Sequence, residues 1–242
     1  MAANRLTVGI FIPCCIDQFS VQTGKNMVGL LERIGCECVY PVEQTCCGQE
    51  LYMNGDRESA RLLGERMIDM FDPFDYVVTC SSGCVAYMKK NFEDLFRNSS
   101  RHNKFPKFID KLCDITDFLV NVMHYTPEGV EFPYRVAFMD HCRTLHDYGL
   151  KEEPRQLLRA IGGLELVEVT DGGVCCGYGG SFANYFEPIS TEMVRQKVDA
   201  YVRAGAQYIV STEPTCLMHM QSYIDKEGID IQCRHIVDIL VP

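Results

Sequence analysis

The sequence lacks the features of a membrane protein and of a nucleic-acid-binding protein. No stretch approaches the roughly 20 uncharged apolar residues that span a bilayer, and the apolar run near the start is too short for a signal peptide. The 23 lysines and arginines are outnumbered by 33 aspartates and glutamates, so the net charge of −10 provides no basic surface for nucleic acid or an anionic membrane. We therefore expect a soluble, cytoplasmic protein that binds no nucleic acid.

Several cofactor motifs are also missing. No G-x-G-x-x-G follows an expected strand and there is no Walker loop, so neither a dinucleotide nor a nucleoside triphosphate is indicated. There is no C-x-x-C-H for covalent haem and no ferredoxin-type cysteine run. The 242 residues are 47% hydrophobic and 23% charged, which is typical of a globular protein with one large or two smaller domains.

Cysteine is the abundant chemical residue, with 14 in the chain. In a reducing cytoplasm so many cysteines are not expected to form a disulfide framework. Thiols kept in such numbers inside a cell usually serve a metal, a cluster or redox exchange. The cysteine pattern is therefore the main guide to function.

The chain is a tandem repeat. Cys46-Cys47-Gly48 recurs as Cys175-Cys176-Gly177, 129 residues later, and segment 76–79 recurs as 208–211. Collinear matches with small insertions and deletions indicate a duplicated unit. Turn residues near position 126 mark the expected join, which predicts two domains at residues 1–126 and 127–242.

The repeat separates two classes of cysteine. Six cysteines do not recur, and we expect most of them to be buried as small hydrophobic residues. The recurring positions are Cys14, Cys46, Cys47 and Cys84 in the first repeat and Cys142, Cys175, Cys176 and Cys216 in the second.

Strands and helices alternate in each repeat, which predicts an α/β fold of two tandem Rossmann-like domains with mainly parallel sheets. The recurring cysteines follow the expected strands. Because the carboxyl ends of parallel strands meet at one edge of a sheet, four thiols should converge in each repeat. We expect strands at 6–12, 38–42, 76–79, 135–139, 164–169 and 208–211. We expect helices at 22–34, 57–71, 85–96, 154–161, 191–204 and 217–224.

Four converging thiolates have three possible uses. They can ligate an iron–sulfur cluster, form a closed structural zinc site, or perform thiol–disulfide exchange. Adjacent Cys-Cys favours a polynuclear cluster, since neighbouring thiolates can reach different metal atoms. The three glycines of segment 177–180 support a bound inorganic group, because a tight glycine loop points its N–H groups inward. His141, His146 and Arg143 flank Cys142, and we expect ordinary loop residues there.

With these residues assembled, the chain resembles the cysteine-rich CCG-domain iron–sulfur proteins. That family carries Cys, then Cys-Cys-Gly, then a closing C-x-x-C, usually in two copies. It includes the catalytic subunit of heterodisulfide reductase, the iron–sulfur subunit of glycolate oxidase and the lactate-utilisation proteins. The last group is the most similar, on segments 43–49 and 175–182.

The resemblance implies an oxidoreductase subunit that oxidises L-lactate, or a related 2-hydroxy acid, to pyruvate. It implies one [4Fe–4S]-type cluster in each repeat, held by the recurring cysteines. It also implies two partners, a ferredoxin-like iron–sulfur protein and a further small subunit.

The chain departs from the family pattern at the closing C-x-x-C. The first cysteine of that motif is replaced by Ser81 in one repeat and by Glu213 in the other, while Cys80 is a candidate fifth ligand in the first repeat only. This weakens a heterodisulfide-reductase-like activity. It leaves a four-ligand cluster, or a non-catalytic subunit with structural zinc, as the alternatives.

Overall fold

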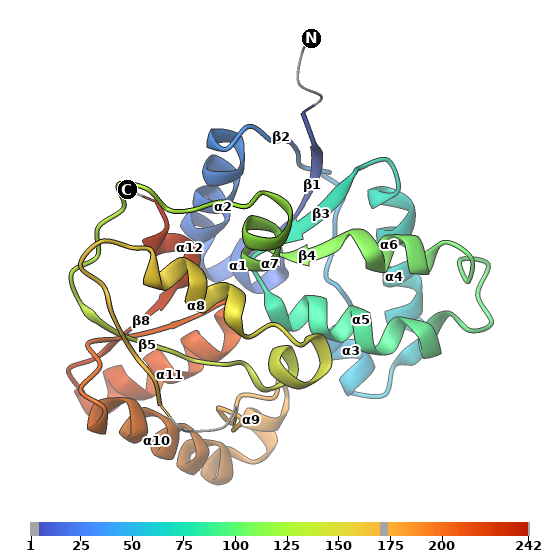
Figure 1. Ribbon diagram of the computed structural model, residues 1–242. Helices are drawn as coiled ribbons and strands as arrows, with labels where there is room; N and C mark the ends of the chain where they lie inside the picture. Colours follow the sequence, from blue (N-terminus) through green and yellow to red (C-terminus); the bar gives the residue numbers. More distant parts are fainter. Residues whose placement is uncertain (1–4, 170–173, 242) are drawn as a thin grey trace.

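Two four-stranded parallel sheets form the framework of the protein (Figure 1). The structure is a computed structural model that describes residues 5–169 and 174–241. The first sheet has the order β2-β1-β3-β4 and the second the order β6-β5-β7-β8. The strands are β1 (Thr7–Phe11), β2 (Glu37–Val39), β3 (Tyr76–Thr79), β4 (Leu112–Asp114), β5 (Arg135–Phe138), β6 (Glu165–Val167), β7 (Tyr208–Ser211) and β8 (Gln232–His235). The expected α/β class with two Rossmann-like parallel sheets is confirmed.

The helices of the first repeat alternate with its strands, and simple sequence rules explain two of them. The Asp56 carboxylate accepts a hydrogen bond from the Ser59 N–H and so caps α4. The α2 helix buries Met27, Leu30 and Leu31 at helical spacing. The helices are α1 (Cys14–Phe19), α2 (Val21–Arg33), α3 (Gln49–Met53), α4 (Arg57–Phe71), α5 (Ser82–Phe96), α6 (Phe105–Lys111), α7 (Ile115–Asp117) and η1 (Phe118–Val122).

The second repeat has the same strand order, but among the described residues it has no counterpart of α6 between β7 and β8. The α11 helix begins with Pro214, whose missing N–H costs nothing at a first helical position, and ends at Gly228 in the left-handed conformation. The helices are η2 (Thr144–Tyr148), α8 (Glu152–Arg159), α9 (Phe182–Tyr185), α10 (Glu187–Arg203), α11 (Pro214–Glu227) and α12 (Ile236–Ile239).

Strands β4 and β8 are the two strands that the sequence patterns did not predict, and the short helices α1, α3, α6, α7, η1, η2, α9 and α12 were not predicted either. Each of the two strands has only three or four residues, and β4 continues directly from α6 without a turn. β4 has only three residues and β8 (Gln232–His235) is mostly polar, so neither shows the apolar run that marks a buried strand. Both strands lie at a sheet edge, beside β3 and β7.

The two repeats share a hydrophobic core. One continuous cluster of buried residues includes Ile10 and Leu30 from the first repeat and Val136, Leu158 and Ile239 from the second. In this cluster α12 packs on α2, and α8 packs on α7 and η1. The repeats therefore form one packed body, and the boundary at residues 126 and 127 stays a prediction.

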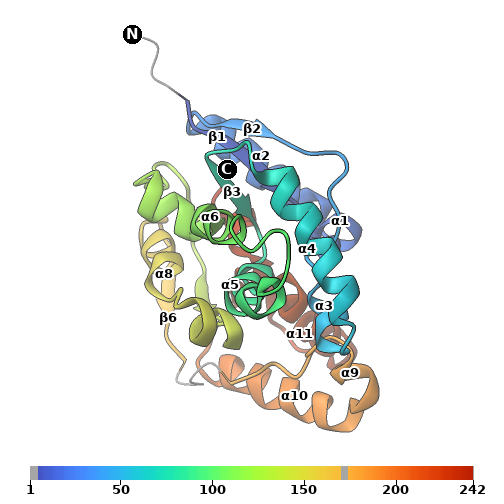
Figure 2. The same cartoon turned by 90° about the vertical axis from the view of Figure 1, so that its right-hand side faces the viewer.

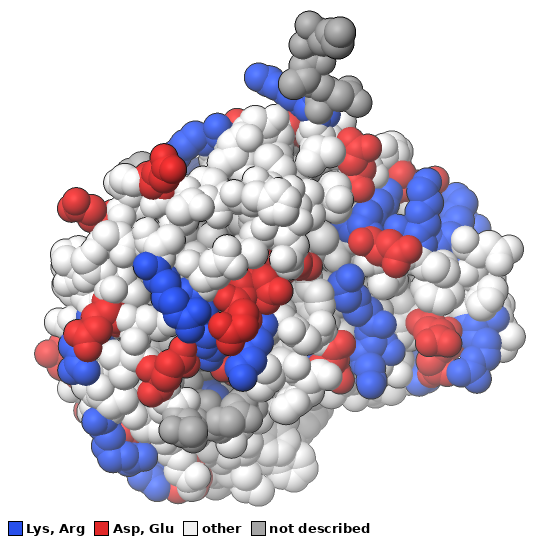
Figure 3. All heavy atoms as spheres, viewed as in Figure 1, with Lys and Arg blue, Asp and Glu red and all other residues white. Residues whose placement is uncertain are grey.

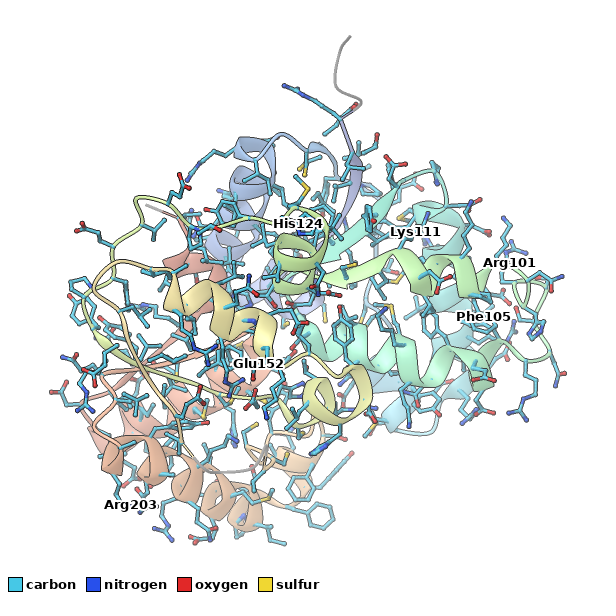
Figure 4. The ribbon with its side chains drawn as sticks, in the orientation of Figure 1. Arg101, Phe105, Lys111, His124, Glu152 and Arg203 are labelled. Atoms are coloured by element: carbon cyan, nitrogen blue, oxygen red, sulfur yellow. The ribbon has the colours of Figure 1, made fainter. Side chains whose placement is uncertain are left out.

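Most charged side chains lie on the surface, but Lys111 is buried. In Figure 3 acidic and basic side chains are interspersed over the visible face. Lys111, labelled in Figure 4, donates through its ammonium group to the backbone carbonyls of Phe71, Asp72 and Phe74, so it joins α6 to the turn before β3. Among residues 5–169 and 174–241, no helix combines the length and apolar character that a membrane crossing requires.

Candidate metal centres

The four recurring cysteines of the first repeat come together in space. Cys14 begins α1 after β1, Cys46 and Cys47 precede α3, and Cys84 lies in the first turn of α5. The Cys14 and Cys46 sulfurs are 3.7 Å apart, and the Cys47 and Cys84 sulfurs are 3.4 Å apart. A hydrogen bond from the Cys47 thiol to Cys46 joins the two pairs. The expected convergence at the sheet edge is therefore found.

The second repeat repeats this arrangement. The Cys176 and Cys216 sulfurs are 2.8 Å apart. The Cys175 sulfur interacts with the thiols of both Cys142 and Cys176. Each set thus forms a series of sulfur contacts in the same order along the chain.

Each set favours one thiolate. Hydrogen bonds from the neighbouring Cys14 and Cys47 thiols hold the pKa of Cys46 well below its usual value, and Cys142 and Cys176 do the same for the pKa of Cys175. A thiolate is the form that ligates metals, and the other thiols would release protons on binding. The donor chemistry of both sets therefore fits a cationic metal group.

The glycine after each vicinal pair adds an N–H donor. The Gly48 N–H points to the Cys46 sulfur at 3.5 Å, and the Gly177 N–H points to the Cys175 sulfur at 3.4 Å. Both glycines have φ of 87°, which favours glycine strongly. At Gly177 a Cβ would also lie 2.8 Å from the Ser190 carbonyl oxygen, so no side chain fits there. Such N–H groups stabilise charge on sulfur.

The sets are enclosed on most sides. Cys47, Cys176 and Cys216 are only 3%, 2% and 5% exposed, whereas Cys14 is exposed. Burial strengthens the hydrogen bonds to sulfur because it removes competing water. Cys14 marks the side on which the first set reaches the surface.

The thiols of each set are joined by short sulfur–sulfur contacts. Among the described residues, no group of three or more His, Cys, Asp or Glu side chains has the arrangement of a site for a metal ion. The thiols instead contact one another in series, so adjacent sulfurs can serve different metal atoms. The four thiols, the glycine N–H groups and the burial of each set together fit a cysteine-ligated cluster.

Cys80 packs in a different hydrophobic cluster from Cys47, although it interacts electrostatically with Cys84. It is fully buried and packs in the core shared by the two repeats, whereas Cys47 packs in a separate cluster beside α4 and α5. Among the described residues, no hydrogen bond joins the Cys80 thiol to the four recurring cysteines. Its role as a fifth ligand stays a prediction.

The other residues near Cys142 serve the structure of the loop. The His141 Nδ1 hydrogen-bonds with the Thr144 hydroxyl at 2.8 Å, and burial lowers the pKa of His141. The Arg143 guanidinium reaches the Met53 thioether at 3.7 Å and the Asp147 carboxylate at 3.6 Å. Arg143 thus contacts both repeats.

A buried polar junction between the two sets was missed by sequence reasoning. The Ser81 hydroxyl donates to the Glu213 carboxylate at 3.0 Å, and the Gly83 N–H donates to the same oxygen at 2.8 Å. Beside them the Thr212 hydroxyl donates to that of Ser82 at 2.8 Å. The sequence did mark positions 81 and 213 as departures from the family pattern, and that departure was the available signal.

Tyr87 was also missed. It lies one turn after Cys84 on α5 and is fully buried, and its hydroxyl has no hydrogen-bond partner among the described residues. Burial, together with the nearby Cys47 and Cys46 sulfurs, raises the pKa of Tyr87. The sequence could not have shown this, because a single aromatic residue in an apolar helix is ordinarily a core residue.

Comparison with known proteins agrees with this geometry. Residues 8–89 and 136–221 each match the cysteine-rich domain family designated CCG. The chain is 35% identical over 236 residues to lactate utilization protein A of Macrococcus caseolyticus, covering 97% of this chain and 96% of that protein. It is 36% identical over 236 residues to lactate utilization protein A of Geobacillus thermodenitrificans, covering 97% and 98%.

A solved structure shares the fold. A hypothetical protein from Helicobacter pylori superposes with a TM-score of 0.67 at 10% identity, over 97% of this chain and 48% of that one. This chain therefore spans about half the length of that structure. At this identity the likeness concerns the fold alone.

Proposed function

The chain belongs to the cysteine-rich CCG domain family, and we propose that it is an iron–sulfur oxidoreductase subunit that takes part in the oxidation of L-lactate, or a related 2-hydroxy acid, to the 2-oxo acid. The observation that carries this proposal is the convergence of four thiols in each repeat beside a glycine N–H group. The names of its full-length relatives support lactate as the substrate class.

In this proposal each repeat holds one [4Fe–4S]-type cluster. When bound, such a cluster supplies a one-electron carrier whose potential depends on ligation, hydrogen bonds to sulfur and burial. The ligands would be Cys14, Cys46, Cys47 and Cys84 in the first repeat and Cys142, Cys175, Cys176 and Cys216 in the second.

The protein residues have three tasks around these sites. The cysteines provide thiolates, and the Gly48 and Gly177 N–H groups stabilise negative charge on sulfur. The buried cores around Cys47 and Cys176 exclude water. Oxidation of a 2-hydroxy acid releases two electrons and two protons, so two one-electron sites in one chain match the electron count.

The proposal includes partners that receive the electrons. We propose a ferredoxin-like iron–sulfur protein and a further small subunit, with the whole complex in the cytoplasm. All 14 cysteines are free thiols in the structure, which fits a reducing compartment. An exposed Cys14 places one edge of the first site where a partner can approach.

Metal and sulfide analysis tests this proposal. Protein purified without oxygen should contain about eight iron and eight acid-labile sulfide per chain, as two four-iron clusters require. A Cys175→Ser variant should keep its fold and lose part of the visible absorption. Zinc without sulfide would contradict the proposal and favour a structural zinc subunit that chelators unfold. A heterodisulfide-reductase-like activity would instead require Cys80 as a ligand.

A further inference from the structure

The Tyr87 hydroxyl is a buried polar group without a partner. Its side chain has no solvent exposure, and the hydroxyl makes no hydrogen bond with any described residue. Buried hydroxyl groups are nearly always hydrogen-bonded, because an unpaired one loses its contacts with water without replacement. An unpaired group in this position calls for an acceptor that binds there.

The ring of Tyr87 is held in place by its neighbours. It packs against the rings of Tyr52 and Phe92, with ring centroids 5.6 and 6.0 Å away. It belongs to the same buried cluster as Cys47, and the Cys47 and Cys46 sulfurs interact electrostatically with its hydroxyl. The acceptor that the hydroxyl lacks is therefore to be expected at the first cysteine set.

The equivalent position of the second repeat is arranged differently. Cys84 and Cys216 are 132 residues apart, and the same offset relates Tyr87 to His219. His219 is not unpaired, because its Nε2 lies 3.1 Å from the Ser190 hydroxyl, which donates to the Gly177 carbonyl at 2.7 Å. The second repeat thus uses this position to hold its glycine loop.

We propose that the Tyr87 hydroxyl donates a hydrogen bond to a sulfur atom of the metal group held by Cys14, Cys46, Cys47 and Cys84. This inference rests on the proposed function, since it needs a group with an accepting sulfur at that site. A hydrogen bond to sulfur stabilises the more negative, reduced state and so raises the reduction potential. Tyr87 is then a positioning and tuning residue of the first site, and the two sites differ in potential because His219 cannot make the same bond.

A redox titration of the full chain tests the inference. Tyr87→Phe keeps the ring and removes the hydroxyl. At a fixed potential, the ratio of reduced to oxidised first site should therefore fall about tenfold. That change is a downward shift of about 59 mV for a one-electron couple. The second site should not move. Equal potentials in wild type and variant would overturn the inference.

Tyr52→Phe is the matched control. Tyr52 contacts the Tyr87 ring, but its hydroxyl already has a partner, since it accepts from the Arg57 guanidinium at 3.2 Å. This variant should leave both potentials unchanged. A shift as large as that of Tyr87→Phe would assign the effect to ring packing and contradict a hydrogen bond to sulfur.

Stability gives a second readout that needs no activity. Without metal the Tyr87 hydroxyl is unpaired, so Tyr87→Phe should raise the denaturation midpoint of metal-free protein. In loaded protein the same change should lower it. Destabilisation of the metal-free form would show that the hydroxyl already has a partner and would overturn the inference. If wild type binds no iron and sulfide, the proposed function fails as well; if it binds both and the variant behaves like wild type, this inference fails alone.

Discussion

Ser81 and Glu213 occupy equivalent positions of the two repeats and hydrogen-bond with each other, the Ser81 hydroxyl donating to the carboxylate at 3.0 Å. Each also caps a helix: Ser81 accepts from the Cys84 N–H at the start of α5, and Glu213 accepts from the Thr215 N–H at the start of α11. The position that the family pattern gives to a cysteine has thus become a contact between the repeats.

We first predict that Glu213→Ala destabilises the protein by about 2–4 kcal/mol, because it leaves the buried Gly83 N–H and the Ser81 hydroxyl without their acceptor. Urea denaturation of the metal-free protein measures this. Glu152→Ala is the control, since the Glu152 pair with Arg159 is more than half exposed and should contribute less than about 1 kcal/mol. A Glu213 effect no larger than the control would contradict a structural role for the junction.

Second, Cys216→Ser should remove iron and sulfide from the second site only, because its sulfur lies 2.8 Å from that of Cys176 within the set. Metal content per chain should fall by about half. Cys233→Ser is the matched control: Cys233 is also a buried cysteine early in its element, but on β8 and outside both sets. Cys80→Ser should likewise leave the metal content unchanged. A loss of iron in that variant would establish a fifth ligand.

Third, Gly177→Ala should disrupt the second glycine loop. The substitution meets both a left-handed backbone, which costs about 1–2 kcal/mol, and the Ser190 carbonyl 2.8 Å from the new Cβ. Gly129→Ala is the control, because Gly129 has φ of 72° and open space around it, so only the backbone cost applies. The variant at position 177 should lose more stability than the control and also lose metal from the second site. Equal stability loss in the two variants would contradict this prediction, because it would show that the contact between the new Cβ and the Ser190 carbonyl oxygen adds no free-energy cost.

Fourth, Asp114 should make the protein less stable as the pH rises. Burial raises the pKa of Asp114 to about 7, above its value of about 3.9 in an unfolded chain. Between these values the folded state binds the proton and the unfolded state does not, so stability falls as the pH rises from about 4 to 7 and the cost is complete above 7.

The effect of Asp114 is on the order of 2–4 kcal/mol across this range. Asp114→Asn keeps the oxygen that accepts from the Thr116 N–H and should make this part of the stability profile flatter. Urea denaturation from pH 5 to pH 8 for wild type and variant measures the difference. Parallel profiles would contradict a raised pKa.

The cysteine sets could be predicted from the sequence because their information is local. Cys14 and Cys84 lie within five residues after the apolar segments that form β1 and β3, and the topology of parallel strands brings strand ends together. The repeat then identified the recurring thiols without knowledge of any distance. The helix expected at 57–71 and the strands expected at 76–79 and 208–211 have those same bounds in the structure.

The tertiary structure decided how the two repeats meet and which groups stay unpaired. The contact between Ser81 and Glu213 joins residues 132 positions apart, and the burial of Tyr87 depends on rings from α3 and α5. Figure 2 shows α3 beside α9, where the Ser181 N–H donates to the Glu50 carboxylate at 3.0 Å. Strand and helix preferences act over a few neighbouring residues, whereas these contacts depend on the packing of two separate sheets around one core. The sequence by itself therefore determined which thiols converge, and only the packing of the repeats determined the polar junction between the two sets and the Tyr87 hydroxyl that has no partner among the described residues.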